Sequence, residues 1–139
     1  MKTDRYRKHH DELLNVVGNI QKYLTVEEVQ SNPAVIRKLL TILAGAVRIH
    51  LAFEDRALYP SLLASTNSTV STTAKQFMDE MSGIQGVLEG YLDKYHSVKI
   101  IKNNPDDFIY ETKELFKVLG ERIGRENRDF YPLVDAMND

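Results

Sequence analysis

Apolar side chains recur at intervals of three and four residues along nearly the whole chain, and this spacing restricts the fold more than any other feature. The first such series reads Tyr6, Leu13, Val17, Ile20 and Leu24. An α-helix places residues three and four apart on one face, whereas a strand alternates its faces at every residue. Because no stretch alternates in the manner of a strand, the sequence predicts an all-α protein.

Four helical segments can be delimited from capping and breaking residues. The first is expected from about Asp4 to Leu24. Ser31-Asn32-Pro33 supplies a cap followed by a first-turn proline, so the second helix starts there and runs to Tyr59-Pro60. The polar stretch from Ser65 to Thr73 is interpreted as a connector and N-cap region before the third helix. Asn103-Asn104-Pro105 caps the fourth helix.

The later helices also carry one apolar stripe each. These stripes are Ile36, Leu39, Leu40, Leu43, Val47 and Leu58 in the second helix, Ala74, Phe77, Met81, Ile84, Leu88, Tyr91 and Tyr95 in the third, and Phe108, Leu115, Leu119 and Phe130 in the fourth. Helices of comparable length with short connectors favour an antiparallel, up-down-up-down four-helix bundle. We expect residues 1–139 to form one such domain, because this length supports one continuous core.

Composition excludes several classes of function. The formal charge of −2 offers no overall basic excess for nucleic acid, and no long uncharged apolar run could span a membrane. The chain has no cysteine, so thiolate nucleophiles and thiolate metal ligands are excluded. With no apolar signal-peptide core after Met1, a cytoplasmic location is expected. No catalytic serine pattern and no glycine-rich phosphate loop are visible, so no enzymatic activity is predicted.

Charged and metal-ligating residues interrupt the apolar stripes at selected positions. His50 and Glu54 are one helical turn apart on the inner stripe of the second helix. His10 lies on the stripe of the first helix, although its neighbour His9 could be the inward residue instead. An imidazole and a carboxylate on one face can bind a metal ion when facing helices supply further ligands.

The fourth helix repeats part of this pattern. The segment Glu54-Asp-Arg-Ala-Leu-Tyr-Pro60 corresponds to Glu126-Asn-Arg-Asp-Phe-Tyr-Pro132, with identical glutamate, arginine, tyrosine and proline. In this register Arg122 corresponds to His50. Two helices are therefore predicted to present an inward carboxylate, but only one of them presents a histidine beside it.

With these residues the chain resembles the hemerythrin-like family of HHE cation-binding domains over essentially its whole length. In that family an antiparallel four-helix bundle holds two irons. The resemblance implies metal-ligand roles for His10, His50, Glu54 and Glu126. It also implies histidines on the third and fourth helices, where this chain has Met81, with Gln85 one turn on, and Arg122. A thioether is a weak ligand for iron, and a guanidinium cannot ligate because it stays protonated.

Two interpretations of the inward charges follow. In the preferred one no cofactor is bound, because the guanidinium of Arg122 neutralises Glu54 and Glu126 in bidentate fashion. The bundle would then be a regulatory module with an unknown protein partner or with self-association. In the alternative, His10, His50, Glu54 and Glu126 hold a single iron or other divalent metal, as in a sensor or storage protein.

The third helix also carries three closely spaced glycines, Gly83, Gly86 and Gly90. Small residues permit close approach of a neighbouring helix, and we expect that contact to lie inside the bundle.

Overall fold

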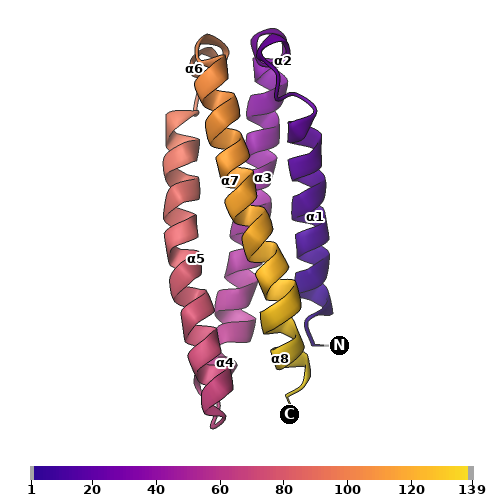
Figure 1. The fold of residues 1–139 in the computed structure, drawn as a ribbon, viewed down its shortest axis with the longest axis vertical. Helices are drawn as coiled ribbons and strands as arrows, with labels where there is room; N and C mark the ends of the chain where they lie inside the picture. Colours follow the sequence, from indigo (N-terminus) through magenta and orange to yellow (C-terminus); the bar gives the residue numbers. More distant parts are fainter. Residues whose placement is uncertain (1, 138–139) are drawn as a thin grey trace.

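Four long helices account for most of the structure, a computed structural model that describes residues 2–137. They are α1 (Asp4–Gln21), α3 (Pro33–Phe53), α5 (Ser68–Lys94) and α7 (Pro105–Arg125). They run alternately up and down, and the two ends of the chain lie at the same end of the molecule (Figure 1). This arrangement confirms the predicted all-α, antiparallel four-helix bundle.

Shorter helical elements join the long ones at both ends of the bundle. Two lie at the end opposite the termini, α2 (Val26–Ser31) and α6 (Val98–Asn103). At the other end, each of two long helices passes through a π-helical turn into a last short α-helix. These elements are η1 (Glu54–Leu58) with α4 (Tyr59–Leu63), and η2 (Glu126–Phe130) with α8 (Tyr131–Asp135). Among the described residues, no helix is both long and apolar enough to cross a lipid bilayer.

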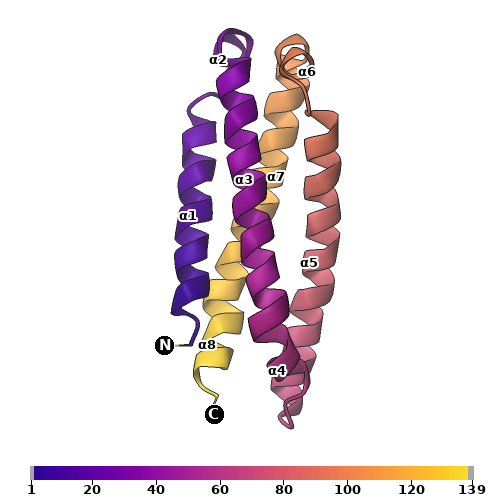
Figure 2. The same ribbon diagram turned by 180° about the vertical axis from the view of Figure 1, so that it is seen from behind.

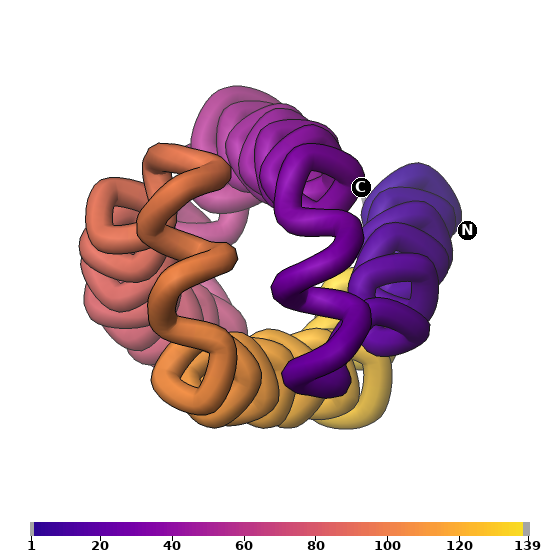
Figure 3. The backbone as a smooth tube through the Cα atoms, turned by 90° about the horizontal axis from the view of Figure 1, so that it is seen from above, coloured from indigo at the N-terminus to yellow at the C-terminus, as the bar shows by residue number. Residues whose placement is uncertain are grey.

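The view along the bundle shows how the long helices neighbour one another. α1 lies between α3 and α7, and α5 lies across the bundle from α1 (Figure 3). Seen from behind, α3 crosses in front of α7 and carries α2 and α4 at its two ends (Figure 2). Each long helix therefore faces the interior with one stripe, as its three-four spacing requires.

Three local expectations from the sequence need correction. The short helices α2 and α6 occupy the segments between the predicted long helices, which were expected to be short connectors. The third long helix begins at Ser68, well inside the polar stretch, because the Asn67 side chain accepts hydrogen bonds from the amides of Thr69 and Val70. The three glycines of α5 are exposed, and a Cβ added at any of them would meet no atom within 4 Å. The predicted close contact inside the bundle is therefore wrong.

The two halves of the chain repeat the same order of elements. α2, α3, η1 and α4 have the same lengths as α6, α7, η2 and α8, and their starts differ by a constant offset. Thr25 and Ser97 cap the corresponding short helices α2 and α6 in the same way. The repeat recognised around Glu54 and Glu126 thus extends over most of each half.

The interior is divided into two apolar clusters. Along α3 and η1, Leu51 belongs to one cluster and Leu58 to the other. Along α7 and η2, the same division falls between Ile123 and Phe130. The buried histidine, glutamate and arginine side chains near these boundaries form a polar layer across the bundle.

Candidate metal centre

The polar layer consists of five side chains that are almost completely removed from solvent. Their exposed fractions are 0% for His10, 4% for His50, 1% for Glu54, 3% for Arg122 and 2% for Glu126. All four ligand candidates from the sequence are therefore buried together. Burial of ionisable groups is unfavourable unless hydrogen bonds, opposite charges or a metal compensate for the lost hydration.

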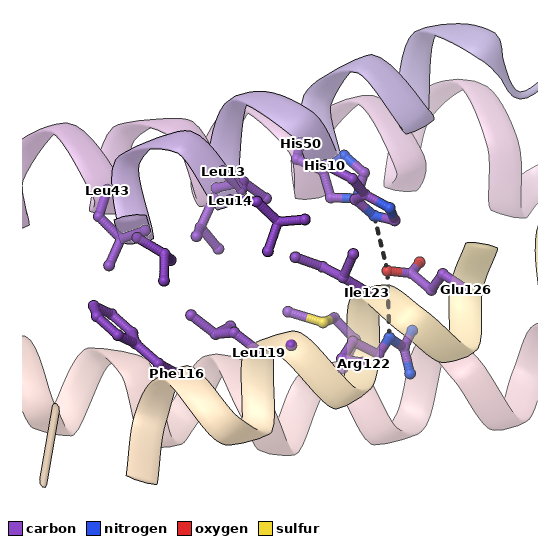
Figure 4. Close-up of a pocket in the computed structure, with 14 residues that line it drawn as sticks. His10, Leu13, Leu14, Leu43, His50, Phe116, Leu119, Arg122, Ile123 and Glu126 are labelled. Atoms are coloured by element: carbon purple, nitrogen blue, oxygen red, sulfur yellow. Dashed lines mark hydrogen bonds and ion pairs between the residues drawn. The ribbon is translucent and has the colours of Figure 1, made fainter. Parts of the chain in front are cut away.

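Three ligand atoms converge in this layer from three different elements. Nε2 of His10 lies 3.2 Å from Nε2 of His50 and 3.3 Å from Oε1 of Glu126. One ligand atom from each of these residues lies within 4.8 Å of the other two. Figure 4 shows both imidazoles pointing toward the Glu126 carboxylate across the interior. His10, not His9, is the histidine of α1 that faces this centre.

Glu54 lies beside the same centre and contacts His50. Its Oε1 is 2.6 Å from Nε2 of His50. Burial, reinforced by the negative charge of Glu126, raises the pKa of Glu54 to about 9. Burial likewise lowers the pKa of His50. At neutral pH without a metal, a neutral Glu54 therefore donates a hydrogen bond to Nε2 of the neutral His50 imidazole.

Glu126 behaves oppositely to Glu54. Burial opposes its ionisation, but a hydrogen bond with His10 and the positive charge of Arg122 outweigh burial and lower the pKa of Glu126. One carboxylate thus carries charge while its neighbour holds a proton. Oε2 of Glu54 and Oε2 of Glu126 are both buried without a hydrogen-bond partner among the described residues.

Arg122 is buried but does not form the bidentate pair that the sequence suggested. Its Nη2 donates to the carbonyl oxygen of Phe77 at 2.7 Å, and its Nη1 lies 3.4 Å from Oε2 of Glu80. The guanidinium carbon also lies 4.6 Å from the centre of the Phe77 ring. Of the guanidinium nitrogens, Nε is the one that faces the carboxylates of the centre, and it lies 3.6 Å from Oε1 of Glu126. The fork of Arg122 is therefore directed toward α5, away from Glu54.

Among the described residues, the third long helix, α5, contributes no imidazole and no carboxylate to the centre. Met81 is buried on its inner face, whereas Gln85 is exposed. Arg122 lies in the second half of the repeat, where the first half has His50, and Met81 lies on α5, which takes the place that α1 has in the first half. The ligands that remain are consequently concentrated in the first half, with Glu126 the contribution of the second.

Each π-helical turn begins at a glutamate of the centre. Pro60 and Pro132 follow these turns, and a proline cannot donate the backbone hydrogen bond that a regular helix requires. The backbone is distorted just before each Tyr-Pro pair, with φ of −108° at Leu58 and −96° at Phe130. The shared Tyr-Pro ending thus accounts for the wider turns, which are frequent at functional sites.

Two residues beside the centre, Tyr131 and Asn127, were not predicted as part of it, and His9 was considered only as an alternative to His10. The Tyr131 hydroxyl lies 3.2 Å from Nε2 of His10. Oδ1 of Asn127 lies 2.9 Å from Nδ1 of His10, and Nδ1 of His9 lies 3.3 Å from Nδ1 of His50. The His9-His10 doublet was the one available signal in the sequence. Asn127 and Tyr131 lie in the repeat, but their roles depend on packing against α1.

Comparison with known proteins gives one result that covers the chain. No curated protein and no solved structure matches it significantly. The family model described as the hemerythrin HHE cation binding domain matches residues 1–134. A helical bundle with histidine and glutamate ligands clustered in its interior is consistent with that match. The chain therefore belongs to the hemerythrin HHE cation-binding domain family.

Proposed function

We propose that this protein is a non-enzymatic, metal-binding member of its family that holds one divalent ion. The observation that carries the proposal is the convergence of buried ligand atoms from His10, His50 and Glu126 within 4.8 Å of one another. Imidazole and carboxylate ligands suit iron, zinc and manganese. Glu54 adjoins the group through His50, and it is the fourth candidate ligand.

The residues present fit one ion better than the two irons of the family. The unpartnered oxygens of Glu54 and Glu126 are buried acceptors that a cation would satisfy. A second ion would need ligands from the other half of the repeat. There Arg122 supplies a fixed positive charge, and Met81 supplies only a thioether. A bound ion would supply the positive charge that two ionised, buried carboxylates require.

The proposal is tested by titrating chelator-treated protein with zinc, iron(II) and manganese in a calorimeter. We expect one ion per chain, and we expect His10→Gln and His50→Gln each to abolish tight binding. His96→Gln is the matched control, because the His96 imidazole is exposed and its Nδ1 lies 2.8 Å from the Asp93 carbonyl oxygen. Wild-type protein that binds no better than the double His10→Gln, His50→Gln variant would contradict the proposal.

A second candidate function is a metal-free regulatory bundle that acts through a protein partner or through self-association. The 3.6 Å approach of Arg122 Nε to Glu126 favours it, because a guanidinium then provides part of the missing positive charge. The same titration separates the candidates, since a metal-free bundle gives no binding heat with any of the three ions. Retention of a partner by both histidine variants would support this second function.

A further inference from the structure

In both His10 and His50, Nδ1 contacts a side chain that does not belong to the proposed ligand set. Nδ1 of His10 is 2.9 Å from Oδ1 of Asn127, and Nδ1 of His50 is 3.3 Å from Nδ1 of His9. The two Nε2 atoms meanwhile face each other at 3.2 Å across the centre. Each ring is therefore contacted on both nitrogens. Its Nδ1 faces a residue outside the ligand set and its Nε2 faces ligand candidates, with the Tyr131 hydroxyl also 3.2 Å from Nε2 of His10.

Asn127 and Glu126 bracket the same ring from consecutive positions of η2. Oε1 of Glu126 approaches Nε2 of His10, while Oδ1 of Asn127 approaches Nδ1. The main-chain oxygen of Asn127 accepts a hydrogen bond from Arg7, whose guanidinium also lies 3.6 Å from Asp135. Contacts at the start of α1 and in α8 thus fix where the Asn127 amide lies.

A neutral imidazole carries its proton on one nitrogen and a lone pair on the other. An amide oxygen can only accept, so Oδ1 of Asn127 selects the form of His10 with the proton on Nδ1. For His50, Oε1 of Glu54 occupies Nε2 at 2.6 Å, which leaves Nδ1 to donate to His9. In both rings Nε2 is then the nitrogen that faces the centre, where a bound metal would replace the contacts that Nε2 makes with Glu126 in His10 and with Glu54 in His50.

We infer that Asn127 and His9 are positioning residues that hold His10 and His50 with the proton on Nδ1 and with Nε2 toward the metal. The inferred role in metal binding rests on the proposed function. The protons on Nδ1 of His10 and His50, however, can be observed in the metal-free protein. Groups that fix a ligand histidine from outside in this way change metal affinity by about 10- to 100-fold when they are lost. In the first half of the repeat, Asp55 is the counterpart of Asn127, and it is exposed.

The first test measures the ring nitrogens directly by NMR of ¹⁵N-histidine-labelled, metal-free protein. We expect His10 and His50 to carry their proton on Nδ1. In Asn127→Leu, which removes the acceptor, the His10 proton should redistribute to Nε2, whereas Asn127→Asp should keep it on Nδ1. His9→Leu and His9→Gln make the same comparison for His50. Wild-type His10 with its proton on Nε2 would overturn the inference for Asn127.

The second test measures zinc affinity and melting temperature on the same variants. We expect binding about 10- to 100-fold weaker in Asn127→Leu and His9→Leu, with affinity restored in Asn127→Asp and His9→Gln. Asn15→Leu, on the exposed face of α1, is the control and should bind as wild type does. Unchanged proton positions and unchanged affinity in both leucine variants would overturn the inference. Protons on Nδ1 in a protein that binds no metal would contradict the proposed function and leave the positioning role standing.

Discussion

Glu54 and Glu126 are chemically identical side chains in one buried layer, yet their surroundings move their pKa values in opposite directions. Burial and the charge of Glu126 raise the pKa of Glu54, whereas His10 and Arg122 outweigh burial and lower the pKa of Glu126. A metal that uses both carboxylates must therefore displace the Glu54 proton. Metal affinity should accordingly rise with pH up to about 9, where Glu54 loses that proton unaided.

The Glu54 proton also predicts a pH dependence of stability in the metal-free protein. Glu54 keeps its proton to higher pH in the folded state than in the unfolded chain, so its contribution is complete at acidic pH. That contribution is lost as pH rises from about 4.5 to about 9. We expect Glu54→Gln to remove this loss, which amounts to at most about 1.4 kcal/mol per pH unit.

Chemical denaturation with chelator at several pH values measures this effect. The stability of Glu54→Gln relative to wild type should increase between pH 6 and pH 8, although the variant loses metal binding. Glu121→Gln, at an exposed position of α7, should follow the wild-type pH dependence. Parallel curves for Glu54→Gln and wild type would show that Glu54 is ionised in the folded protein.

Arg122 gives a second prediction at this scale, because its surface neighbour Arg125 shares two of its partners. Both guanidinium groups contact Glu80, and both lie over the Phe77 ring. Removal of a buried charge partner costs about 3–5 kcal/mol, whereas exposed ion pairs contribute about 1 kcal/mol or less. Arg122→Leu should therefore destabilise the protein far more than Arg125→Leu.

The pH dependence of the Arg122→Leu deficit is also fixed in sign. The lowered pKa of Glu126 contributes stability at neutral pH that is lost as pH falls through the folded-state pKa. Without Arg122 this contribution shrinks, so the deficit should be largest near neutral pH and smaller in acid. Denaturation of both leucine variants at pH 4 and pH 7 measures it. Equal deficits for the two variants would show that Arg122 contributes only surface contacts.

Sequence periodicity was sufficient to identify which charged residues lie inside, because burial follows directly from position on a helical stripe. His10, His50, Glu54, Arg122 and Glu126 were all placed inward, and all are buried. The direction of the Arg122 fork could not be predicted in this way. It depends on the carbonyl oxygen of Phe77, whose position near Arg122 arises only when α5 packs against α7.

At the scale of elements, the four long helices could be predicted from the sequence, but the short helices and the π-helical turns could not. Proline and asparagine marked the starts of α3 and α7, because those residues act locally. The π-helical turns were missed, although the Tyr-Pro repeat that accompanies them was recognised. A π-turn differs from an α-turn by a single added residue, which hardly alters the three-four spacing over so short a stretch.

The exposed glycines of α5 give a prediction at the same scale. A glycine within a helix costs about 1 kcal/mol relative to alanine, and a Cβ at Gly86 would meet no atom within 4 Å. We expect Gly86→Ala to raise the unfolding free energy by about 0.5–1 kcal/mol and Gly83→Ala to act additively with it. Denaturant titration measures both changes. A loss of stability that depends on protein concentration would instead reveal a contact between copies of the chain.

For the molecule as a whole, the distribution of ligands over the helices decides what a metal would hold together. α1, α3, η1 and η2 carry His10, His50, Glu54 and Glu126, whereas α5 contributes none of the ligand candidates. α1 packs chiefly against α3 and meets α7 through far fewer residues. An ion bound by His10 and Glu126 would therefore bridge α1 and the end of α7. This α1–α7 interface is smaller than the α1–α3 interface.

This distribution predicts an uneven response to metal across the bundle. A ligand that binds only the folded state adds about 2.7 kcal/mol at a free concentration one hundred times its Kd. Local opening that separates α1 from η2 must break the metal site, so amides of α1, η2 and α8 should gain protection from hydrogen exchange. Opening confined to the end of α5 near α6 leaves every ligand in place, and its amides should gain least.

Hydrogen exchange followed by mass spectrometry, with zinc and with chelator, measures this pattern peptide by peptide. His10→Gln supplies the control, because without that ligand α1 is no longer tied to η2 and its amides should exchange alike in both conditions. Equal protection of α5 and α1 by zinc would mean that the ion stabilises the whole fold and does not specifically hold α1 against η2. The prediction that one ion ties α1 to η2 through His10 and Glu126 would then be wrong.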